Sequence, residues 1–249
     1  MGRTSEAAIL CGGRGERLKP LSDYFQKVMI PMGPKKLPLL AYTIALLKSH
    51  GITKITLLTG YRSEDIRHYF GDGQKHGVEL TYSEDPKDRK GSLNALANAL
   101  NTGVIDYPDE LLVYYGDVLA DLNVGAFLRT HRKKKADATL VLAKGYMLPV
   151  GTAEVGRNGM VKAFHEKPTL ELSVATGCFV AAPSALVHMK ATASQANTDL
   201  MTHFLPGFLR AGKRVAAFYT TAEWYDIGTV SSFEKLDKEL AHHPLGRLV

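Results

Sequence analysis

The chain has 249 residues, of which 45% are hydrophobic and 22% charged, and its net charge is +6; this is the ordinary composition of a soluble globular protein with one large or two small domains. No stretch approaches the roughly 20 apolar residues of a membrane-spanning helix, and residues 1–6 are polar rather than signal-like, so we expect no membrane partner and a cytoplasmic location. The positive charge is spread along the chain instead of forming one basic patch, so no nucleic acid partner is expected.

Short apolar runs alternate with amphipathic stretches in the first half of the chain, which is typical of an α/β fold. A strand at 7–10 precedes a glycine-rich loop at 12–15, and apolar residues at helical spacing predict a helix that starts near Pro38. Ser63 and Asn123 are predicted helix N-caps. The other predictions for this half are strands at 54–59, 78–82, 111–115 and 138–143 and a helix at 92–100.

The pattern changes after about residue 145. Alternating runs at 152–155 and 160–164 flank Asn158-Gly159, and an Asn-Gly pair in such a position is a strong hairpin signal. The predictions beyond it are a strand at 174–182, a helix from Pro183, a helix capped by Asp199 that reaches about Ala211, a strand at 215–219 and a terminal helix at 231–242. The sequence shows no repeat and no linker, which predicts one domain over residues 1–249.

The most informative segment is the glycine-rich loop with the basic residues that follow it. Gly12, Gly13 and Gly15 come directly after a strand, and glycines let backbone N–H groups approach phosphate oxygens closely. Arg17 and Lys27 add fixed positive charge for a polyphosphate. A dinucleotide-binding fingerprint is excluded because leucine stands at its third glycine position, and a Walker A loop is excluded because no Gly-Lys-Ser/Thr follows.

This segment resembles the signature of the sugar-phosphate nucleotidyltransferase family, G-G-x-G-x-R-L-x-P-L-[TS]-x-x-x-P-K. The matching residues are Gly12, Gly13, Gly15, Arg17, Leu18, Pro20, Leu21, Ser22 and Lys27. The chain departs from the signature at Gln26, where the family has proline. The resemblance implies that the loop and Arg17 hold the β- and γ-phosphates of an NTP and that Lys27 lies near the α-phosphate.

Two aspartates are candidate metal ligands. Asp117 ends a buried strand, which is a typical ligand position in open α/β sheets, and Asp226 lies in the apolar-aromatic run 224–229. From the residues alone, each aspartate could equally be a helix cap or part of a turn. The family has a Gly-Asp element and a W-x-D-x-G-T element, which these two aspartates match. The resemblance therefore implies that Asp117 and Asp226 bind a catalytic Mg²⁺, which in proteins is usually held by one or two carboxylates and substrate phosphates.

Two segments of the second half resemble the family's sugar-phosphate elements. Glu166 and Lys167 precede a proline after the predicted hairpin, and taken alone they indicate a surface turn. In the family's E-K-P element, the lysine contacts the phosphate of the sugar phosphate and the glutamate faces the sugar. The resemblance implies these roles for Lys167 and Glu166. Gly177 matches the glycine of the family's N-x-G element, where the backbone approaches the sugar. Ala175 replaces the asparagine of that element, which implies an altered sugar site.

The predicted helix at 92–100 begins where the family has a G-T-A-like element. Gly91 and Ser92 match its first two positions. Ser92 is expected to cap the helix. The resemblance implies that its hydroxyl also contacts the nucleoside, as the family's threonine does, whereas capping alone is the simpler interpretation. The preceding segment, 85–90, is charged where the family is often apolar, which leaves the preferred base open.

The motifs follow family order from about residue 7 to 236. The resemblance implies an α/β, Rossmann-like three-layer sandwich with a mixed, mostly parallel central sheet, similar to the GT-A fold. In this fold, residues to about 145 form the nucleotide-binding core, and residues 146–249 form a small sugar-binding insertion and closing elements. The residues implied at the nucleotide are Leu10, Gly12, Gly13, Gly15, Arg17, Gly91, Ser92 and Gly116. The implied catalytic residues are Arg17, Lys27, Asp117, Lys167 and Asp226.

The implied reaction joins an NTP and a sugar-1-phosphate to give an NDP-sugar and pyrophosphate by Mg²⁺-dependent in-line attack on the α-phosphate. A sugar phosphate is already an anion at neutral pH, so catalysis consists of positioning and charge neutralisation rather than base catalysis. The chain looks most like mannose-1-phosphate guanylyltransferases. The alternatives are glucose-1-phosphate uridylyl-, thymidylyl- and cytidylyltransferases and heptose-1-phosphate guanylyltransferases. The sequence also leaves open whether the chain forms a homo-oligomer.

Two other classes of function are weighed against this one. A paralogue that only binds nucleotide sugars is allowed by Gln26 and Ala175, although the full set of charged motif residues argues against it. A glycosyltransferase that uses nucleotide sugars would usually show a D-x-D metal pair, which Asp117-Val118-Leu119 does not supply.

Overall fold

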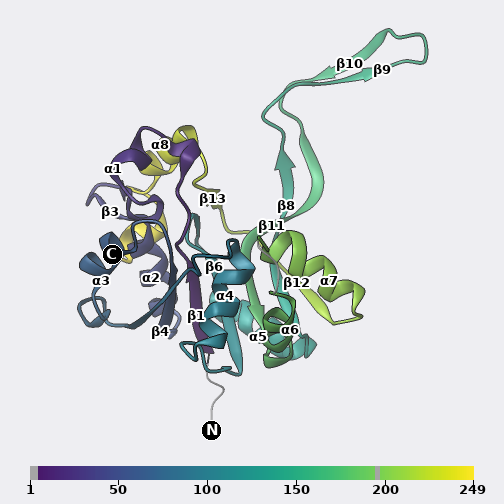
Figure 1. Ribbon diagram of the computed structural model, residues 1–249. Coiled ribbons are helices and arrows are strands. Elements are labelled where there is room, and N and C mark those ends of the chain that lie inside the picture. The colour runs from purple at the N-terminus through teal and green to yellow at the C-terminus, as the bar shows by residue number, and fades with distance from the viewer. Residues whose placement is uncertain (1–4, 194–196) are drawn as a thin grey trace.

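In the computed structural model, which describes residues 5–193 and 197–249, a seven-stranded sheet lies between two layers of helices (Figure 1). The strands lie in the order β12-β8-β11-β6-β1-β4-β5. They are β1 (Ser5–Leu10), β4 (Lys54–Thr59), β5 (Glu79–Glu84), β6 (Glu110–Tyr115), β8 (Ala138–Met147), β11 (Thr169–Ala181) and β12 (Val215–Thr220). Neighbouring strands are parallel except where β11 lies antiparallel to β6 and β8. The predicted mixed, mostly parallel sheet is confirmed.

Both faces of this sheet are covered, so alternate side chains of a strand enter two different apolar layers. On β1, Ala7 and Ile9 belong to one core cluster and Ala8 to the other. The first cluster includes residues of α2 (Leu39–Ser49), α3 (Ser63–Phe70), α5 (Val124–Lys134) and α8 (Val230–Glu239), and the second those of α4 (Ser92–Asn101), α6 (Pro183–Thr192) and α7 (Leu205–Arg210). This burial explains why the strands read as continuous hydrophobic runs. Within residues 5–193 and 197–249, no helix is both long and apolar enough to cross a membrane.

Most predicted elements are confirmed, and the differences lie mainly at helix starts. Pro38 does not open α2 but precedes it, in the short strand β3 (Leu37–Pro38). Ser63 is not an N-cap, because it is already helical and Arg62 holds the cap position of α3. Asn123 caps α5 as predicted, since its side chain accepts a hydrogen bond from a first-turn amide.

Two small sheets were not predicted. β7 (Val118–Ala120) pairs antiparallel with β13 (Trp224–Asp226), and β2 (Pro31–Met32) pairs antiparallel with β3. Strands of two or three residues are too short to show a recognisable period. The β7–β13 pair fixes the segment that ends in Asp226 beside the segment that follows Asp117.

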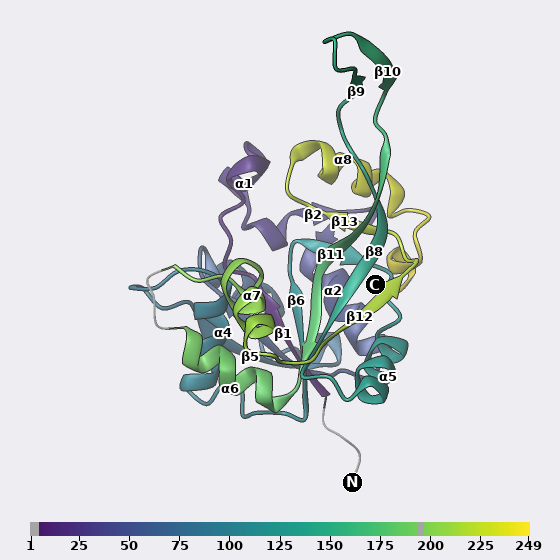
Figure 2. The same ribbon diagram turned by 90° about the vertical axis from the view of Figure 1, so that its right-hand side faces the viewer.

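β8 and β11 continue past the sheet as a two-stranded ribbon that projects from the body of the molecule (Figures 1 and 2). The ribbon ends in the hairpin of β9 (Thr152–Val155) and β10 (Val161–His165), which confirms the predicted hairpin. Gly159 at its turn has a φ of +77°, a conformation that favours glycine. Both long strands exceed their predicted lengths, because their outer parts are exposed on both faces and carry no clear alternation.

Candidate active site

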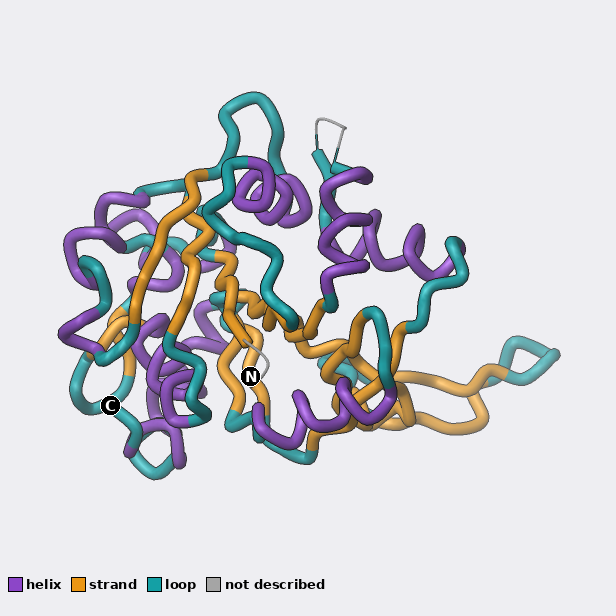
Figure 3. Tube along the Cα trace, turned by 90° about the horizontal axis from the view of Figure 1, so that it is seen from below, coloured by secondary structure: helices purple, strands orange, loops and turns teal. Residues whose placement is uncertain are grey.

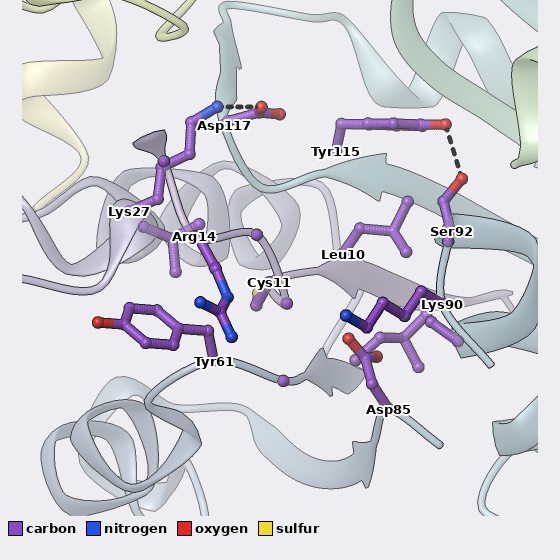
Figure 4. Close-up of a pocket in the computed structure, with 18 of the residues that line it drawn as sticks. Leu10, Cys11, Arg14, Lys27, Tyr61, Asp85, Lys90, Ser92, Tyr115 and Asp117 are labelled. Carbon is purple, nitrogen blue, oxygen red and sulfur yellow. Dashed lines mark hydrogen bonds and ion pairs between the residues drawn. The ribbon is translucent and has the colours of Figure 1, made fainter. Parts of the chain in front are cut away.

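A pocket of about 960 Å³ opens at the carboxyl ends of β1, β4, β5 and β6 (Figure 4). Ligands of open α/β sheets usually bind at this edge. The residues predicted at the nucleotide or the metal that line it are Leu10, Gly12, Gly13, Gly15, Lys27, Gly91, Ser92 and Asp117. The loop after β1 and the helix start at Gly91 therefore meet in one cavity, as the motif order implies.

The glycine loop is held close to the end of β4 and leaves little room for side chains. The Cys11 amide donates a hydrogen bond to Leu58 O at 2.7 Å. A Cβ at Gly12 would overlap the Asp85 carboxylate, so the glycine leaves room for that side chain. Gly15 has a φ of +67°, which also favours glycine. These positions keep the backbone of the loop exposed to the pocket.

Gln26, which replaces the family proline, ties the loop to the next turn. Its side chain is fully buried, and its Nε2 donates to the carbonyl oxygens of Cys11 and, at 3.4 Å, of Gly13. Its Oε1 accepts a hydrogen bond from the Val28 amide at 2.6 Å. One amide side chain thus links both arms of the loop to the 3₁₀ turn Lys27–Met29. The departure from the family signature has a structural role in this chain.

Lys27 and Asp117 form an ion pair at the pocket wall. The distance from Lys27 Nζ to Asp117 Oδ2 is 2.5 Å, and the lysine is buried (Figure 4). Gly116 makes this approach possible, because its amide donates to Leu10 O at 3.0 Å and a Cβ there would lie 2.7 Å from that oxygen. Gly116 thus contacts the end of β1 and does not line the pocket.

Asp226 lies next to this pair. The β7–β13 ladder pairs it with Val118, and the Ile227 amide donates to Asp117 O at 2.8 Å. Burial raises the pKa of Asp226, as does the nearby charge of Asp117, while Lys27 and Arg17 lower it. The structure thus brings both predicted metal ligands to one place. Two crowded hard-oxygen donors, one of them with a raised pKa, fit the binding of a divalent cation such as Mg²⁺.

Arg17 lies on the Asp226 side of this cluster. A Cβ at Gly228 would lie 3.0 Å from Arg17 Nη2 and 3.2 Å from Asp226 Oδ1, so the two charged groups flank this glycine. Neither Arg17 nor Asp226 lines the pocket itself. The Arg17 guanidinium therefore lies near the Asp226 carboxylate and outside the pocket.

Ser92 lines the pocket but does not cap α4, so its predicted capping role is wrong. Gly91 holds the N-cap position of α4, and no side chain caps that helix. Ser92 Oγ donates to Asp199 Oδ1 at 2.9 Å and accepts a hydrogen bond from the Leu200 amide at 3.0 Å. Asp199 likewise does not cap its own helix, which starts as the π-helical turn Leu200–Phe204. These contacts fix the 198–200 segment against α4.

Several residues of the pocket were not predicted. Arg14 lies 5.2 Å from the ring centroid of Tyr61, and Lys90 and Tyr115 complete the wall near Ser92 (Figure 4). Their positions in the sequence carry no motif, since they come from four different loops or strand ends. The one sequence feature that pointed to these residues was the charge of segment 85–90, and Asp85 and Lys90 of that segment do line the pocket.

Asp85 is the unexpected carboxylate of this site. It follows β5, and its amide donates to Thr59 O at 2.7 Å. Its Oδ1 is buried and has no hydrogen-bond partner among the described residues. Burial raises its pKa to about 6. A buried, unpartnered acceptor in a ligand pocket is suited to receive donors from a ligand.

The residues predicted at the sugar phosphate are divided between two places. Gly177 has a φ of +75° and packs against Tyr115 beside the pocket. Glu166 and Lys167 lie on the projecting ribbon, directly after β10, and do not line the pocket. Within one chain, the structure therefore does not bring Lys167 to Lys27 and Asp117.

The fold and site together define an α/β domain with a glycine-rich loop and two neighbouring carboxylates at the carboxyl ends of its parallel strands. The chain belongs to the Nucleotidyl transferase family, whose model matches residues 6–243.

Named relatives agree with this assignment. The chain is 29% identical to a UTP–glucose-1-phosphate uridylyltransferase from Synechocystis sp., covering 92% of this chain and 61% of that protein. It is 27% identical to a mannose-1-phosphate guanylyltransferase from Mycobacterium tuberculosis, covering 94% of this chain and 64% of that protein. It is 28% identical to a D-glycero-alpha-D-manno-heptose 1-phosphate guanylyltransferase from Aneurinibacillus thermoaerophilus, covering 96% of this chain and 99% of that one. The chain thus spans about three fifths of the first two relatives and almost all of the third.

Solved structures show the same fold. A putative glucose-1-phosphate thymidylyltransferase from Bacillus anthracis, in complex with sucrose, has a TM-score of 0.76 at 22% identity and covers 96% of both chains. HddC from Yersinia pseudotuberculosis, complexed with GMP-PN, has a TM-score of 0.72 at 19% identity and covers 94% of this chain and 98% of that one.

Proposed function

We propose that this chain is a sugar-1-phosphate guanylyltransferase, which transfers GMP from GTP to mannose-1-phosphate and releases pyrophosphate. The observation that carries the proposal is the meeting of the glycine loop, the Lys27–Asp117 pair and Asp226 at one edge of the sheet. This arrangement supplies positive charge and backbone N–H groups for a triphosphate. It offers no activated nucleophile among the pocket residues, which suits a reaction whose nucleophile is the substrate's own phosphate.

The reaction needs one bond made and one broken. A phosphate oxygen of the sugar phosphate attacks the α-phosphorus, and the bond between that phosphorus and the β-bridging oxygen breaks, so that pyrophosphate leaves with the electron pair. The loop at 12–15 and Lys27 hold the triphosphate and offset the charge that develops on the leaving group. Arg17, beside Gly228, extends this positive field. Such preorganised charges are the main source of catalysis when no proton transfer is needed.

Asp117 and Asp226 are the residues that would hold Mg²⁺, which when bound neutralises charge on the phosphates. Their own contribution is to place two carboxylates where the triphosphate enters. Lys27 forms an ion pair with Asp117 and so compensates its charge. When the substrates bind, Asp117 would exchange its contact with Lys27 for one with the cation, and Lys27 would turn to a phosphate.

Asp85 supports guanine as the base. Guanine presents two adjacent donors, N1–H and N2–H₂, which match the two acceptor oxygens of a carboxylate. Uracil, thymine and cytosine lack this pair of adjacent donors, and adenine has only its exocyclic amine on that edge. The unpartnered Oδ1 of Asp85 lies in the same pocket as the loop. Two of the three relatives described above are guanylyltransferases.

The proposed sugar is mannose-1-phosphate, and the manno-configured heptose-1-phosphate is the alternative, because a heptose guanylyltransferase matches the chain over nearly its full length. Glucose-1-phosphate with UTP is the third possibility, from the Synechocystis relative.

The test is a pyrophosphate-release assay with Mg²⁺ that crosses the four common NTPs and dTTP with these three sugar phosphates. Release from GTP with a manno-configured sugar phosphate is expected. Release from another pair would correct the substrate and keep the class. No release from any pair, with nucleotide or nucleotide-sugar binding intact, would favour a binding paralogue.

A further inference from the structure

The structure gathers positive charge at one end of the molecule, although the sequence spreads it along the chain. Segments 122–137 and 200–222 contain eight lysines and arginines against one acidic residue, Asp137. All other residues together contain twenty-three lysines and arginines against twenty-four acidic residues, so their net charge is −1 and that of the two segments is +7. The net charge of the chain, +6, therefore comes entirely from these two segments.

The pairing of β8 with β12 brings the two segments together. These strands are parallel, with Ala138 opposite Val215, and the Asp137 amide donates to Arg214 O at 2.8 Å. The Arg214 guanidinium donates to Lys134 O, at the end of α5, at 2.9 Å. The result is a group of six exposed basic side chains, called the basic corner below: Lys133, Lys134, Lys135, Arg210, Lys213 and Arg214.

The basic corner lies at the edge of the sheet opposite the pocket. Asp137 and Arg214 directly precede β8 and β12, and both strands run parallel to β6, at whose carboxyl end the pocket opens. Figures 1 and 2 show α5 at the end of the molecule opposite the ribbon of β9 and β10, and Figure 3 views the molecule from that end. A partner bound to the basic corner would therefore leave the pocket open to solvent.

The charges of the basic corner are not neutralised within the chain. Asp137 is its acidic residue, but that carboxylate already accepts hydrogen bonds from Ser184 Oγ at 2.6 Å and from the Arg214 amide at 2.9 Å. Among the described residues, no carboxylate forms an ion pair with any of the six side chains. Six clustered cations repel one another, so an anionic partner would relieve this repulsion.

Helix ends explain only part of this cluster. A helix C-terminus attracts cations, which accounts for Lys133 and Lys134 in the last turn of α5. It does not account for Lys213 and Arg214, which lie in the loop before β12 and come from a different part of the sequence. The meeting of the two groups is a property of the surface and not of either helix.

The chemistry of the basic corner fits anionic lipid headgroups better than nucleic acid. Four of its six side chains are lysines, which act as point charges rather than as the planar forks that arginines present to phosphates and bases. Leu209 is 53% exposed, and the Gly212 amide donates to Leu209 O at 3.0 Å, so this leucine borders the turn that carries Lys213. An exposed apolar side chain among lysines is suited to the interface of a bilayer.

Nucleic acid would find no stacking partner here. Single strands bind through aromatic side chains on which their bases stack. In segments 129–137 and 205–214, Phe208 and His131 are the aromatic side chains, and both are buried.

The remainder of the same edge limits how a membrane could approach. Glu6, Glu79 and Asp106 lie near Lys54, the first residue of β4. β4 lies toward the other side of the sheet from β12. These carboxylates would repel anionic lipid, so the contact is confined to the basic corner and the molecule is tilted on the membrane.

We propose that the basic corner is a docking surface for membranes that contain anionic lipids, with its six basic side chains facing the headgroups and Leu209 entering the interface. The contact is peripheral, so it needs neither a spanning helix nor a signal segment, the two features on which the expectation of no membrane partner rested. Each basic residue near an anionic bilayer strengthens binding about fivefold. The proposal concerns a surface remote from the pocket and does not rest on the proposed function.

Sedimentation of the purified full chain with lipid vesicles tests the proposal. The probes are vesicles of pure phosphatidylcholine and vesicles in which about one third of the lipid is phosphatidylglycerol. We expect binding to the anionic vesicles alone. Raising the salt concentration from about 0.1 M to about 1 M should release the protein, because the Debye length falls from about 10 Å to about 3 Å.

Two variants of the basic corner are compared with one matched control. Lys133→Gln, Lys134→Gln and Lys213→Gln together should weaken binding about 10²-fold, since three charges are lost. Leu209→Ser should weaken it by less, roughly three- to tenfold. The control changes three exposed lysines elsewhere to glutamine, which gives the same net charge, and should bind within about twofold of the wild type. Its lysines are Lys75, Lys162 and Lys238.

The variants should fold like the wild type. Their replaced side chains are exposed, and Arg214, which donates to the end of α5, is kept. Circular dichroism and melting temperatures check this. Pyrophosphate release without lipid should be equal in the wild type and the triple variant of the basic corner, because the pocket lies at the opposite edge.

Three results would overturn the proposal. The first is a wild type that does not bind anionic vesicles at about 0.1 M salt. The second is an equal loss of binding in the two triple variants, since binding would then follow net charge alone. The third is tighter binding to RNA oligonucleotides than to vesicles, lost in the triple variant of the basic corner, which would assign this surface to nucleic acid. A wild type that binds vesicles but releases no pyrophosphate would contradict the proposed function and support the docking surface.

Discussion

Lys27 Nζ lies 2.5 Å from Asp117 Oδ2, although the two residues are 90 positions apart in the chain. The short distance follows from two neighbouring turns, one after the glycine loop and one after β6. The lysine therefore compensates a carboxylate that also lies beside Asp226. Under the proposed function, the same ammonium would contact a phosphate oxygen of the bound triphosphate.

Removing Lys27 should make the protein depend more on Mg²⁺ for its stability. In Lys27→Ala, Asp117 and Asp226 face each other without the nearby ammonium, and the repulsion between them is no longer offset. We expect a lower melting temperature than wild type in EDTA and a larger rise on addition of Mg²⁺, because a ligand that binds the folded state stabilises it. Thermal melts of both proteins with and without Mg²⁺ measure this. An equal rise in the two proteins would contradict the placement of the cation.

Asp117→Ala should lower the rate of pyrophosphate release by about 10²–10³-fold, the usual effect of one preorganised charge. The fold should be intact, because Asp117 is part of no core cluster. Asp121→Ala is the matched control, since Asp121 is an exposed aspartate that directly follows β7. Retention of more than a tenth of the wild-type rate by the Asp117 variant would remove this residue from the mechanism.

Gln26→Ala should weaken both the fold and nucleotide binding. It removes buried hydrogen bonds to the Cys11 and Gly13 carbonyls and to the Val28 amide, and leaving such groups unpaired costs about 1–3 kcal/mol. We expect a lower melting temperature and a raised KM for GTP with a smaller change in kcat. Steady-state kinetics and thermal melts measure these quantities. A variant with wild-type KM and melting temperature would show that Gln26 does not position the loop.

Asp85→Ala should reduce the preference for GTP over the other NTPs. A carboxylate that pairs with two donors of one base contributes about 1–3 kcal/mol of discrimination, which corresponds to roughly 5- to 150-fold. The ratio of kcat/KM for GTP to that for UTP is the quantity to measure. Glu84→Ala is the control, because Glu84 is an exposed neighbour that also borders the pocket. An unchanged ratio for the Asp85 variant would assign base selection elsewhere.

Asp85 should also leave a signature in the pH dependence of stability. Burial raises its pKa from the ordinary value of 3.8 to about 6, so the folded state holds its proton more tightly than the unfolded state does. Its contribution is therefore fully present below pH 3.8 and is lost as pH rises through about 6. Asp85→Asn, which does not titrate, should lack this part of the slope. Denaturant melts of both proteins between pH 4 and 7 compare them, and parallel curves would contradict the raised pKa.

The sequence predicted the sheet and the helices well, because strands buried on both faces leave clear apolar runs and Asn123 leaves a clear cap. It also placed the glycine loop and Asp117 correctly at one edge of the sheet. It missed the short pair β7–β13, and therefore gave no structural reason, beyond the family resemblance, for Asp226 to lie beside Asp117. Asp85 escaped notice because burial, and not a motif, makes it unusual.

The position of Lys167 shows a second limit of sequence reasoning. Motif order along the chain placed it at the pocket, whereas the structure places it on the ribbon that projects from the body.

The most direct test of the proposed function is pyrophosphate release by the purified wild-type protein with GTP, mannose-1-phosphate and Mg²⁺. Omission of each component and the Asp117→Ala variant serve as blanks. We predict release that requires both substrates and forms GDP-mannose in equal amount. Pyrophosphate formed without the sugar phosphate, or none with any NTP and sugar phosphate pair, would contradict it.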